Sequence, residues 1–210
     1  GARIHSMGHY AEYERLAKAN IALWERAGVT TIVTACADGY HAFKRLYPEL
    51  GSKFNVLHIV EYIDQLIREG KLTFSKEVPM TVTYHDPCHL GRQGEPYEPW
   101  EGEEQKFKNQ IVVHSPKKPR YNGINGIYEE PRNILNAIPG IELQEMERNR
   151  EFSYCCGAGG GARESYPEFS QWVAGERLEE AKSTGVQTLV TACPWCKTNF
   201  TESLGDDAEF

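Results

Sequence analysis

Two stretches of the chain repeat each other at a constant offset of 157 residues. Residues 27–43 read AGVTTIVTACADGYHAF, and residues 184–200 read TGVQTLVTACPWCKTNF. Each copy joins a short β-branched run to a turn and a helix-like segment, and each follows a segment with helical apolar spacing. This agreement predicts an internal duplication. The copies differ in one chemically important position, because Cys196 of the second copy corresponds to Gly39 of the first.

Short apolar strands alternate with helices along the rest of the chain. Strands are expected at 29–35, 55–59, 78–84, 141–146 and 186–192, with helices at 10–27, 40–46, 60–69, 129–137, 167–182 and 194–204. This alternation is typical of α/β proteins with parallel sheets. We therefore predict an α/β fold of two pseudo-repeated Rossmann-like units, with parallel sheets and flanking helices.

The two predicted units differ in completeness. Residues 1–80 are expected to form a partial, degenerate first repeat, which lacks counterparts of the later cysteines. Residues 81–210 are expected to form a complete second repeat with an inserted loop at about 93–125, a stretch rich in polar residues, proline and glycine. The missing counterparts also suggest that the sequence starts inside a longer protein.

Charge and hydropathy exclude several classes of function. The 210 residues carry a formal net charge of −7, whereas nucleic-acid binding needs a basic face. No apolar run approaches the roughly 18 residues of a membrane helix, and no secretory signal is visible at the N-terminus. We expect a cytoplasmic protein without a direct membrane span and without a nucleic-acid partner. Peripheral attachment to the inner face of the cytoplasmic membrane stays open.

Five of the six cysteines occur in positions that suit metal or redox chemistry. Cys193 and Cys196 form a C-x-x-C motif at a strand-to-helix turn, where two sulfurs point at one centre and backbone N–H groups stabilise a thiolate. Alone, this motif fits zinc, a redox dithiol or an iron–sulfur ligand pair. In a reducing compartment structural disulfides are disfavoured.

The adjacent pair Cys155 and Cys156 is more informative. Neighbouring side chains reach one centre only from an irregular loop, and the following glycines allow one. Gly157, Gly159 and Gly160 would also let the backbone approach an inorganic cluster closely.

The carboxyl ends of parallel strands meet at one edge of a sheet. Cys36, Cys88 and Cys193 each follow a predicted strand, so they are expected to lie near one crevice together with the 155–156 pair. Five thiolates exceed the four ligands of tetrahedral zinc or of an ordinary cubane cluster. They favour an unusual iron–sulfur cluster, with zinc and dithiol redox chemistry as the alternatives.

Three motifs together resemble a known family. HDPCHLGR at 85–92, CCGAGGG at 155–161 and CPWC at 193–196 resemble the CCG, or cysteine-rich, domain of heterodisulfide reductase catalytic subunits and of iron–sulfur subunits of glycolate and lactate oxidation systems. The resemblance covers nearly the whole chain. It implies one noncubane [4Fe-4S] cluster that splits a disulfide. By position, its ligands would be Cys88, Cys155, Cys156, Cys193 and Cys196, whereas family copies with incomplete sets bind zinc or nothing.

The gap of 66 residues between Cys88 and Cys155 is longer than the family usually shows. This insert, beside one intact repeat, makes the chain similar to the DsrK-type subunit of the membrane redox complex of sulfur-metabolising microbes. That resemblance implies a small sulfur-carrier protein or another disulfide substrate, and partner subunits that carry iron–sulfur clusters or link to quinones. The alternatives are an electron-relay subunit of a hydroxyacid oxidase-type complex and a structural zinc-binding module.

The same motifs suggest supporting roles. His85 is a candidate proton donor beside the cysteines, unless it only fixes the turn by binding backbone. Arg92 would stabilise an anionic cluster or form a structural ion pair, and Trp195 would exclude water. Cys36 is either a buried relic or a contact across the repeat interface. The basic run at 117–121 is a candidate docking site for an acidic partner, or an ordinary solvated loop.

Overall fold

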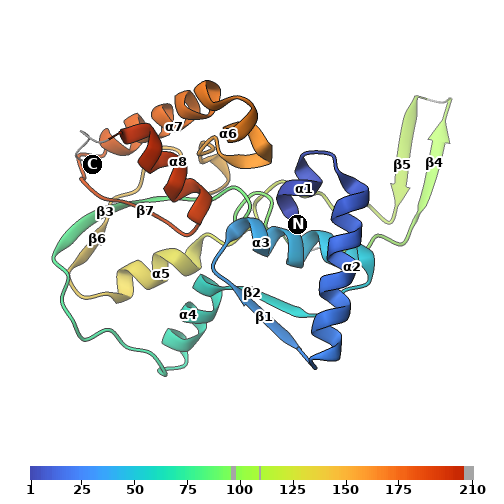
Figure 1. Cartoon of the computed structure of the whole chain (residues 1–210), viewed down its shortest axis with the longest axis horizontal. Coiled ribbons are helices and arrows are strands. Elements are labelled where there is room, and N and C mark those ends of the chain that lie inside the picture. Colours follow the sequence, from blue (N-terminus) through green and yellow to red (C-terminus); the bar gives the residue numbers. More distant parts are fainter. Residues whose placement is uncertain (96–97, 109, 206–210) are drawn as a thin grey trace.

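Parallel sheets with flanking helices make up the protein, as the sequence predicts. A computed structural model describes residues 1–95, 98–108 and 110–205 (Figure 1). In one sheet β1 (Thr31–Thr34) pairs with β2 (Asn55–His58). In the other, β3 (Met80–His85) lies between β6 (Ile141–Leu143) and β7 (Leu189–Thr191). All of these pairings are parallel.

Helices flank the parallel sheets (Figure 1). They are α1 (Ala2–Ser6), α2 (Tyr10–Arg26), α3 (Ala37–His41), α4 (Ile59–Arg68), α5 (Glu129–Ala137), α6 (Ala162–Ser165), α7 (Pro167–Lys182) and α8 (Pro194–Leu204). Short 3-10 turns lie at Arg150–Phe152 and Gly159–Gly161. Successive residues of a strand point to opposite faces of its sheet. Tyr84 accordingly packs in a cluster with Leu135 of α5, whereas the His85 ring lies edge-on to Phe200 of α8. No helix within the described ranges is long and apolar enough to cross a membrane.

The helix expected at 40–46 is longer than predicted. It begins at Ala37 and continues beyond α3 as a π turn, Ala42–Leu46, and a 3-10 turn, Tyr47–Leu50. Pro48 lies in the first turn of the 3-10 segment, where a backbone N–H would have no partner within the helix, so its absence from proline costs nothing.

The offset of 157 residues also relates structural elements. It separates the first residues of α2 and α7, the last residues of β1 and β7, and the first residues of α3 and α8. Cys36 and Cys193 are the N-caps of α3 and α8, and both have extended backbone. The predicted strand–turn–helix unit is therefore present twice. The domain boundary at residue 80 stays a prediction.

One hydrophobic core joins the two ends of the chain. Tyr40 and Val56, from the segment that carries the two-stranded sheet, pack in the same buried cluster as Leu178 and Phe200 of the C-terminal helices. Full burial of such side chains stabilises the fold by about 1.5–3 kcal/mol each.

The insert at about 93–125 is not the plain loop that the sequence predicts. Within it, β4 (Glu103–Phe107) and β5 (Ile111–Ser115) form an antiparallel hairpin that projects from the body, at the right of Figure 1. Four of the five residues of β4 are polar and all are exposed, so no alternation of apolar and polar residues marks the strand. Residues 96–97 and 109 of the insert lie outside the described residues.

Candidate metal centre

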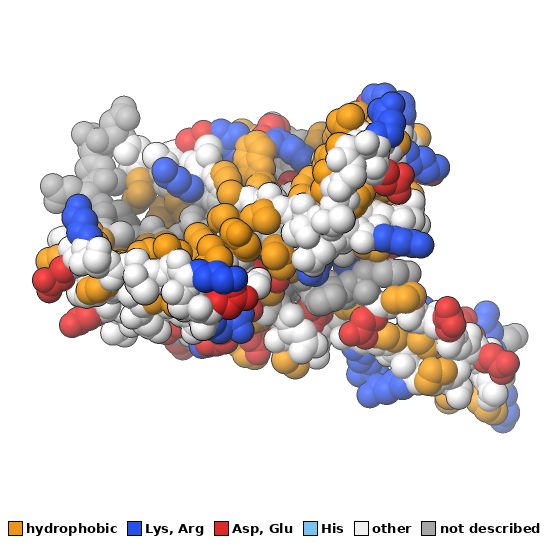
Figure 2. Space-filling view, turned by 90° about the horizontal axis from the view of Figure 1, so that it is seen from below, with side chains coloured by type: hydrophobic (Ala, Val, Ile, Leu, Met, Phe, Trp, Pro, Cys, Tyr) orange, Lys and Arg blue, Asp and Glu red, His pale blue; other side chains and the backbone are white. Residues whose placement is uncertain are grey.

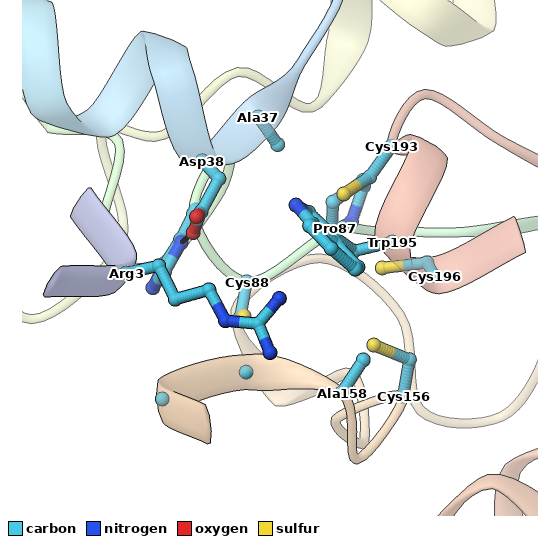
Figure 3. A pocket seen from close by; sticks show the side chains of 13 residues that line it. Arg3, Ala37, Asp38, Pro87, Cys88, Cys156, Ala158, Cys193, Trp195 and Cys196 are labelled. Carbon is cyan, nitrogen blue, oxygen red and sulfur yellow. Dashed lines mark hydrogen bonds and ion pairs between the residues drawn. The ribbon is translucent and has the colours of Figure 1, made fainter. Parts of the chain in front are cut away.

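Three segments bring the five motif cysteines together, and all of them except Cys155 line one pocket. Cys88 lies in the turn after β3, Cys155 and Cys156 precede the glycine-rich turn before α6, and Cys193 and Cys196 lie at the start of α8. Pro194 occupies the first turn of α8, where its fixed φ suits a helix start. Figure 3 shows the sulfurs of Cys88, Cys156, Cys193 and Cys196 facing the same space.

The five thiol groups form one continuous series of hydrogen-bonded side chains. Cys88 interacts with Cys155, Cys155 with Cys156, Cys156 with Cys196, and Cys196 with Cys193. All of them are free thiols. The structure thus brings together the cysteines that the sequence grouped, although their role as metal ligands stays a prediction.

Two of these sulfurs are favoured as thiolates. Hydrogen bonds from Cys156 and Cys88 hold the pKa of Cys155 well below its usual range, and the Gly157 N–H donates to its Sγ at 3.3 Å. The thiol of Cys196 and N–H groups of the helix start lower the pKa of Cys193 to about 7. Since the thiolate is the metal-binding form of cysteine, the site is already partly prepared for a cation.

The glycines that follow the cysteine pair have different roles. Gly157 has φ +84°, and a Cβ there would lie 2.4 Å from the carbonyl oxygen of Ser170 in α7. Gly160 also has positive φ, but a Cβ would meet nothing within 4 Å, and Gly159 likewise has open space around it. Gly159 and Gly160 line the pocket, whereas Gly157 fits the loop against α7.

Trp195 and Arg92 occupy different surroundings. Trp195 lines the pocket, with the Arg3 guanidinium carbon 4.7 Å from the centre of one of its rings (Figure 3). Arg92 instead donates from Nη1 to the carbonyl of Glu151 at 3.4 Å, just upstream of the cysteine pair. Its positive charge also acts on Cys88, where it favours the thiolate.

His85 is fully buried beside the sulfurs. One of its ring nitrogens and the Sγ atoms of Cys156 and Cys196 all lie within 4.8 Å of one another. Arg177 Nε donates to His85 Nδ1 at 3.2 Å, so the neutral ring carries its hydrogen on Nε2. Burial, together with Arg177, lowers the pKa of His85 to about 3. A neutral N–H donor fits this environment better than an imidazolium.

The sequence analysis missed Arg177. Its side chain is completely buried and donates to the carbonyl of Arg148 at 2.8 Å, to Glu180 Oε2 at 2.6 Å and to Ser153 Oγ at 3.0 Å. It thereby ties the segment before Cys155 to α7 while it orients His85. The sequence did contain a signal for its burial, because Ala174, Arg177, Leu178 and Ala181 have the spacing of one buried helix face.

Asp38 and His41 of α3 were also missed. His89, next to Cys88, donates from Nδ1 to Asp38 Oδ1. The His41 ring stacks on His89 at 4.8 Å, and its Nδ1 donates to the carbonyl of Gln93 at 2.6 Å. Asp38 also lines the pocket. The first copy of the repeat therefore holds the Cys88 turn in place.

Cys36 lies close enough to Cys193 for their charges to interact, and burial raises its pKa. It does not belong to the hydrogen-bonded series of five thiols described above. Its role stays a prediction.

Fold and site together define an α/β protein with a pocket lined by free cysteines that follow the carboxyl ends of β3 and β7 or lie in the loop before α6. The chain belongs to the cysteine-rich (CCG) domain family, whose model matches residues 1–44 and 111–201. This confirms the resemblance drawn from the three motifs.

Curated relatives agree with this assignment. One of the subunits of the dihydromethanophenazine:CoB–CoM heterodisulfide reductase of Methanosarcina acetivorans is 35% identical over 202 residues, which are 93% of this chain and 42% of the relative. The probable iron-sulfur-binding oxidoreductase FadF of Bacillus subtilis is 34% identical over 200 residues, 95% of this chain and 23% of the relative. EtfAB:quinone oxidoreductase of Syntrophomonas wolfei is 29% identical over 211 residues, 97% and 25%. The chain spans about two fifths of the heterodisulfide reductase proteins that it matches.

Proposed function

We propose that this chain is the cluster-binding part of an iron–sulfur oxidoreductase subunit that reduces or forms a disulfide or trisulfide. The observation that carries the proposal is the series of five hydrogen-bonded thiols, four of which line one pocket. Relatives named heterodisulfide reductase, iron-sulfur-binding oxidoreductase and quinone oxidoreductase support the same class.

The donor set fits an iron–sulfur cluster better than zinc. Structural zinc takes four ligands in a closed tetrahedron, which would leave one of these five sulfurs without a role. We infer a noncubane [4Fe-4S] cluster held by Cys88, Cys155, Cys156, Cys193 and Cys196, with zinc as the less favoured occupant. When bound, such a cluster supplies single electrons and an iron that accepts a substrate sulfur.

The surrounding residues have separate tasks. His85 directs a fixed hydrogen-bond donor toward the sulfur region, and Arg177 keeps its tautomer constant. Trp195 shields the pocket from water, and the Arg3 guanidinium, which is also ion-paired with Glu164, lies against it. Asp38 holds the Cys88 turn through His89.

The finer assignments follow the DsrK-like resemblance. The substrate would be a small sulfur-carrier protein or another disulfide. Other iron–sulfur subunits and quinone-linked membrane subunits would exchange electrons with this chain at the cytoplasmic face of the membrane.

Metal content of anaerobically purified protein tests the cofactor. We expect iron and acid-labile sulfide in the wild type and in Cys36→Ser, and loss of both in Cys156→Ser. Cys36→Ser is a matched control because it also removes one thiol near the pocket. Equal iron in wild type and Cys156→Ser would overturn the assignment, and zinc without iron would favour the structural zinc module.

Electron paramagnetic resonance separates the enzyme from an electron relay. If the cluster meets substrate, a thiol or disulfide added to the oxidised protein changes its signal. An unchanged signal across a range of thiols and disulfides, with the iron retained, would favour the relay.

A further inference from the structure

The hairpin of β4 and β5 stands apart from the rest of the molecule. Figure 2 shows it as a separate lobe at the lower right, where hydrophobic side chains lie among Lys, Arg and acidic side chains. Among the described elements its two strands pack chiefly on each other. Since an isolated two-stranded hairpin is marginally stable in water, a projecting one gains from a partner surface.

The strand register gives the hairpin one apolar face. Phe107 pairs with Ile111, and Gln105 with Val113, so these side chains share a face. Phe107, Ile111 and Val113 are 44–61% exposed, and Val112 on the opposite face is 45% exposed. Exposed apolar side chains gathered on one element are typical of an interaction surface.

A basic rim lies beside this apolar surface. Val112 and Val113 line a groove together with Lys117, Lys118 and Arg120. Residues 110–120 contain these three cations and no acidic residue, although the whole chain carries a net charge of −7. On the adjacent strand, Glu104 is paired with His114 at 3.1 Å, and Glu103 lies opposite Ser115.

β5 also offers backbone groups to a partner. Among the described residues its sheet has two strands, so the edge of β5 away from β4 has N–H and C=O groups that pair with no strand of this part of the chain. Such an edge accepts an additional strand, with side-chain pockets selecting the sequence.

We propose that this groove binds an extended acidic segment of a partner protein, which adds along β5 and places its carboxylates on Lys117, Lys118 and Arg120. Apolar side chains of the same segment cover the valines. The proposal goes beyond the proposed function and does not depend on the cluster. A protein segment is the expected occupant because the groove combines a strand edge, an apolar floor and cations.

The hairpin is connected to the turn that carries Cys88. The Ile127 N–H donates to the Leu90 carbonyl at 3.1 Å, and the Asn125 N–H donates to Glu95 Oε1 at 3.0 Å. Both ends of the insert are thus attached to the segment that borders the cysteine pocket. A partner bound at the hairpin is therefore attached, through the insert, to the segment that borders the cysteine pocket.

Binding of a fluorescein-labelled peptide of alternating glutamate and valine to the purified protein tests the proposal. We expect saturable binding that weakens with salt, and no binding of the matching lysine–valine peptide. The triple reversal Lys117→Glu, Lys118→Glu and Arg120→Glu is expected to weaken binding by at least about tenfold, because opposite charges become like charges.

The matched control reverses Lys53, Lys76 and Lys197, which are exposed and lie outside the groove. This control changes net charge equally and is expected to leave binding within about twofold. Circular dichroism verifies that both triple variants are folded.

The proposal would be overturned if the two triple variants weakened binding equally, or if the glutamate and lysine peptides bound equally well. Self-association through the hairpin that the acidic peptide does not displace would also overturn it, because the groove would then take a second copy.

Discussion

At Asp38 the first copy of the repeat supplies a carboxylate where the second copy has Trp195, 157 residues later. Both side chains line the same pocket. Asp38 reaches across to His89, so one residue links α3 to the turn that carries Cys88. The contact spans 51 residues of sequence, which explains why motif analysis did not find it.

We expect Asp38→Asn to reduce the free energy of unfolding by about 1–3 kcal/mol, because it weakens a largely buried, charge-assisted hydrogen bond. The same change should speed loss of iron to a chelator, since the Cys88 turn is held less firmly. Chemical denaturation and chelator kinetics measure the two effects. Glu12→Gln, which removes an exposed pair with Arg15, is the control and should change neither. An Asp38→Asn protein as stable as this control would contradict the role of Asp38.

At the scale of elements, the features that the sequence predicts correctly are those that depend on residues close together in the chain. C-x-x-C at a helix start, the Cys155–Cys156 pair and the long helices all follow from neighbouring residues, and the structure contains them. The β4–β5 hairpin has no such local pattern, because cross-strand pairing and not alternation defines it. Arg177 joins segments that no local motif connects.

The loop after the cysteine pair gives a prediction at this scale. Gly157→Ala should destabilise the protein by about 1–3 kcal/mol, because a side chain at positive φ is strained and its Cβ would meet a backbone oxygen. Thermal unfolding of the purified variants measures the change. Gly159→Ala, in the same loop with open space around it, should have a much smaller effect. If both variants unfolded alike, the different roles assigned to these glycines would be wrong.

The junction of β2 and α4 predicts acid sensitivity. His58 Nδ1 accepts from the Val60 N–H at 3.3 Å, and burial lowers the pKa of His58 from 6.5 to about 4. Protonation therefore favours the unfolded chain. The stability that depends on neutral His58 is complete above pH 6.5 and is lost as pH falls toward 4, by up to about 3 kcal/mol.

His58→Asn keeps a helix-capping side chain and removes this titration. Urea unfolding at pH 7 and pH 5 should show a smaller difference between the two pH values for the variant than for the wild type. An unchanged pH difference would show that His58 does not contribute to the acid sensitivity.

At the scale of the whole molecule, the two copies share one core and one pocket. Cys36 and Cys193 cap equivalent helices, yet only the second copy has the second thiol of a C-x-x-C motif. A Cβ built at Gly39 would lie 3.8 Å from Cys36 Cβ, within the range of disulfide-bonded pairs, and 3.2 Å from Thr34 Oγ1.

Gly39→Cys should therefore allow a disulfide between Cys36 and the introduced thiol after mild oxidation, once the Thr34 hydroxyl has rotated away. Thiol titration and peptide mapping measure it, with wild type and Cys36→Ser/Gly39→Cys as controls. If oxidised Gly39→Cys protein did not lose two titratable thiols, the first copy would not keep the backbone geometry of the C-x-x-C turn in the second copy.

The clamp of Asp38 and His41 on the Cys88 turn limits how far the protein can be shortened. A copy without its own pair of thiols looks dispensable, and a minimal version beginning at residue 81 would retain all five motif cysteines. That truncation would remove the hydrogen-bond partners of His89 and of the Gln93 carbonyl. It would also open one wall of the pocket to water. The first copy thus lacks the second thiol of the C-x-x-C motif, yet the second copy still depends on it for support.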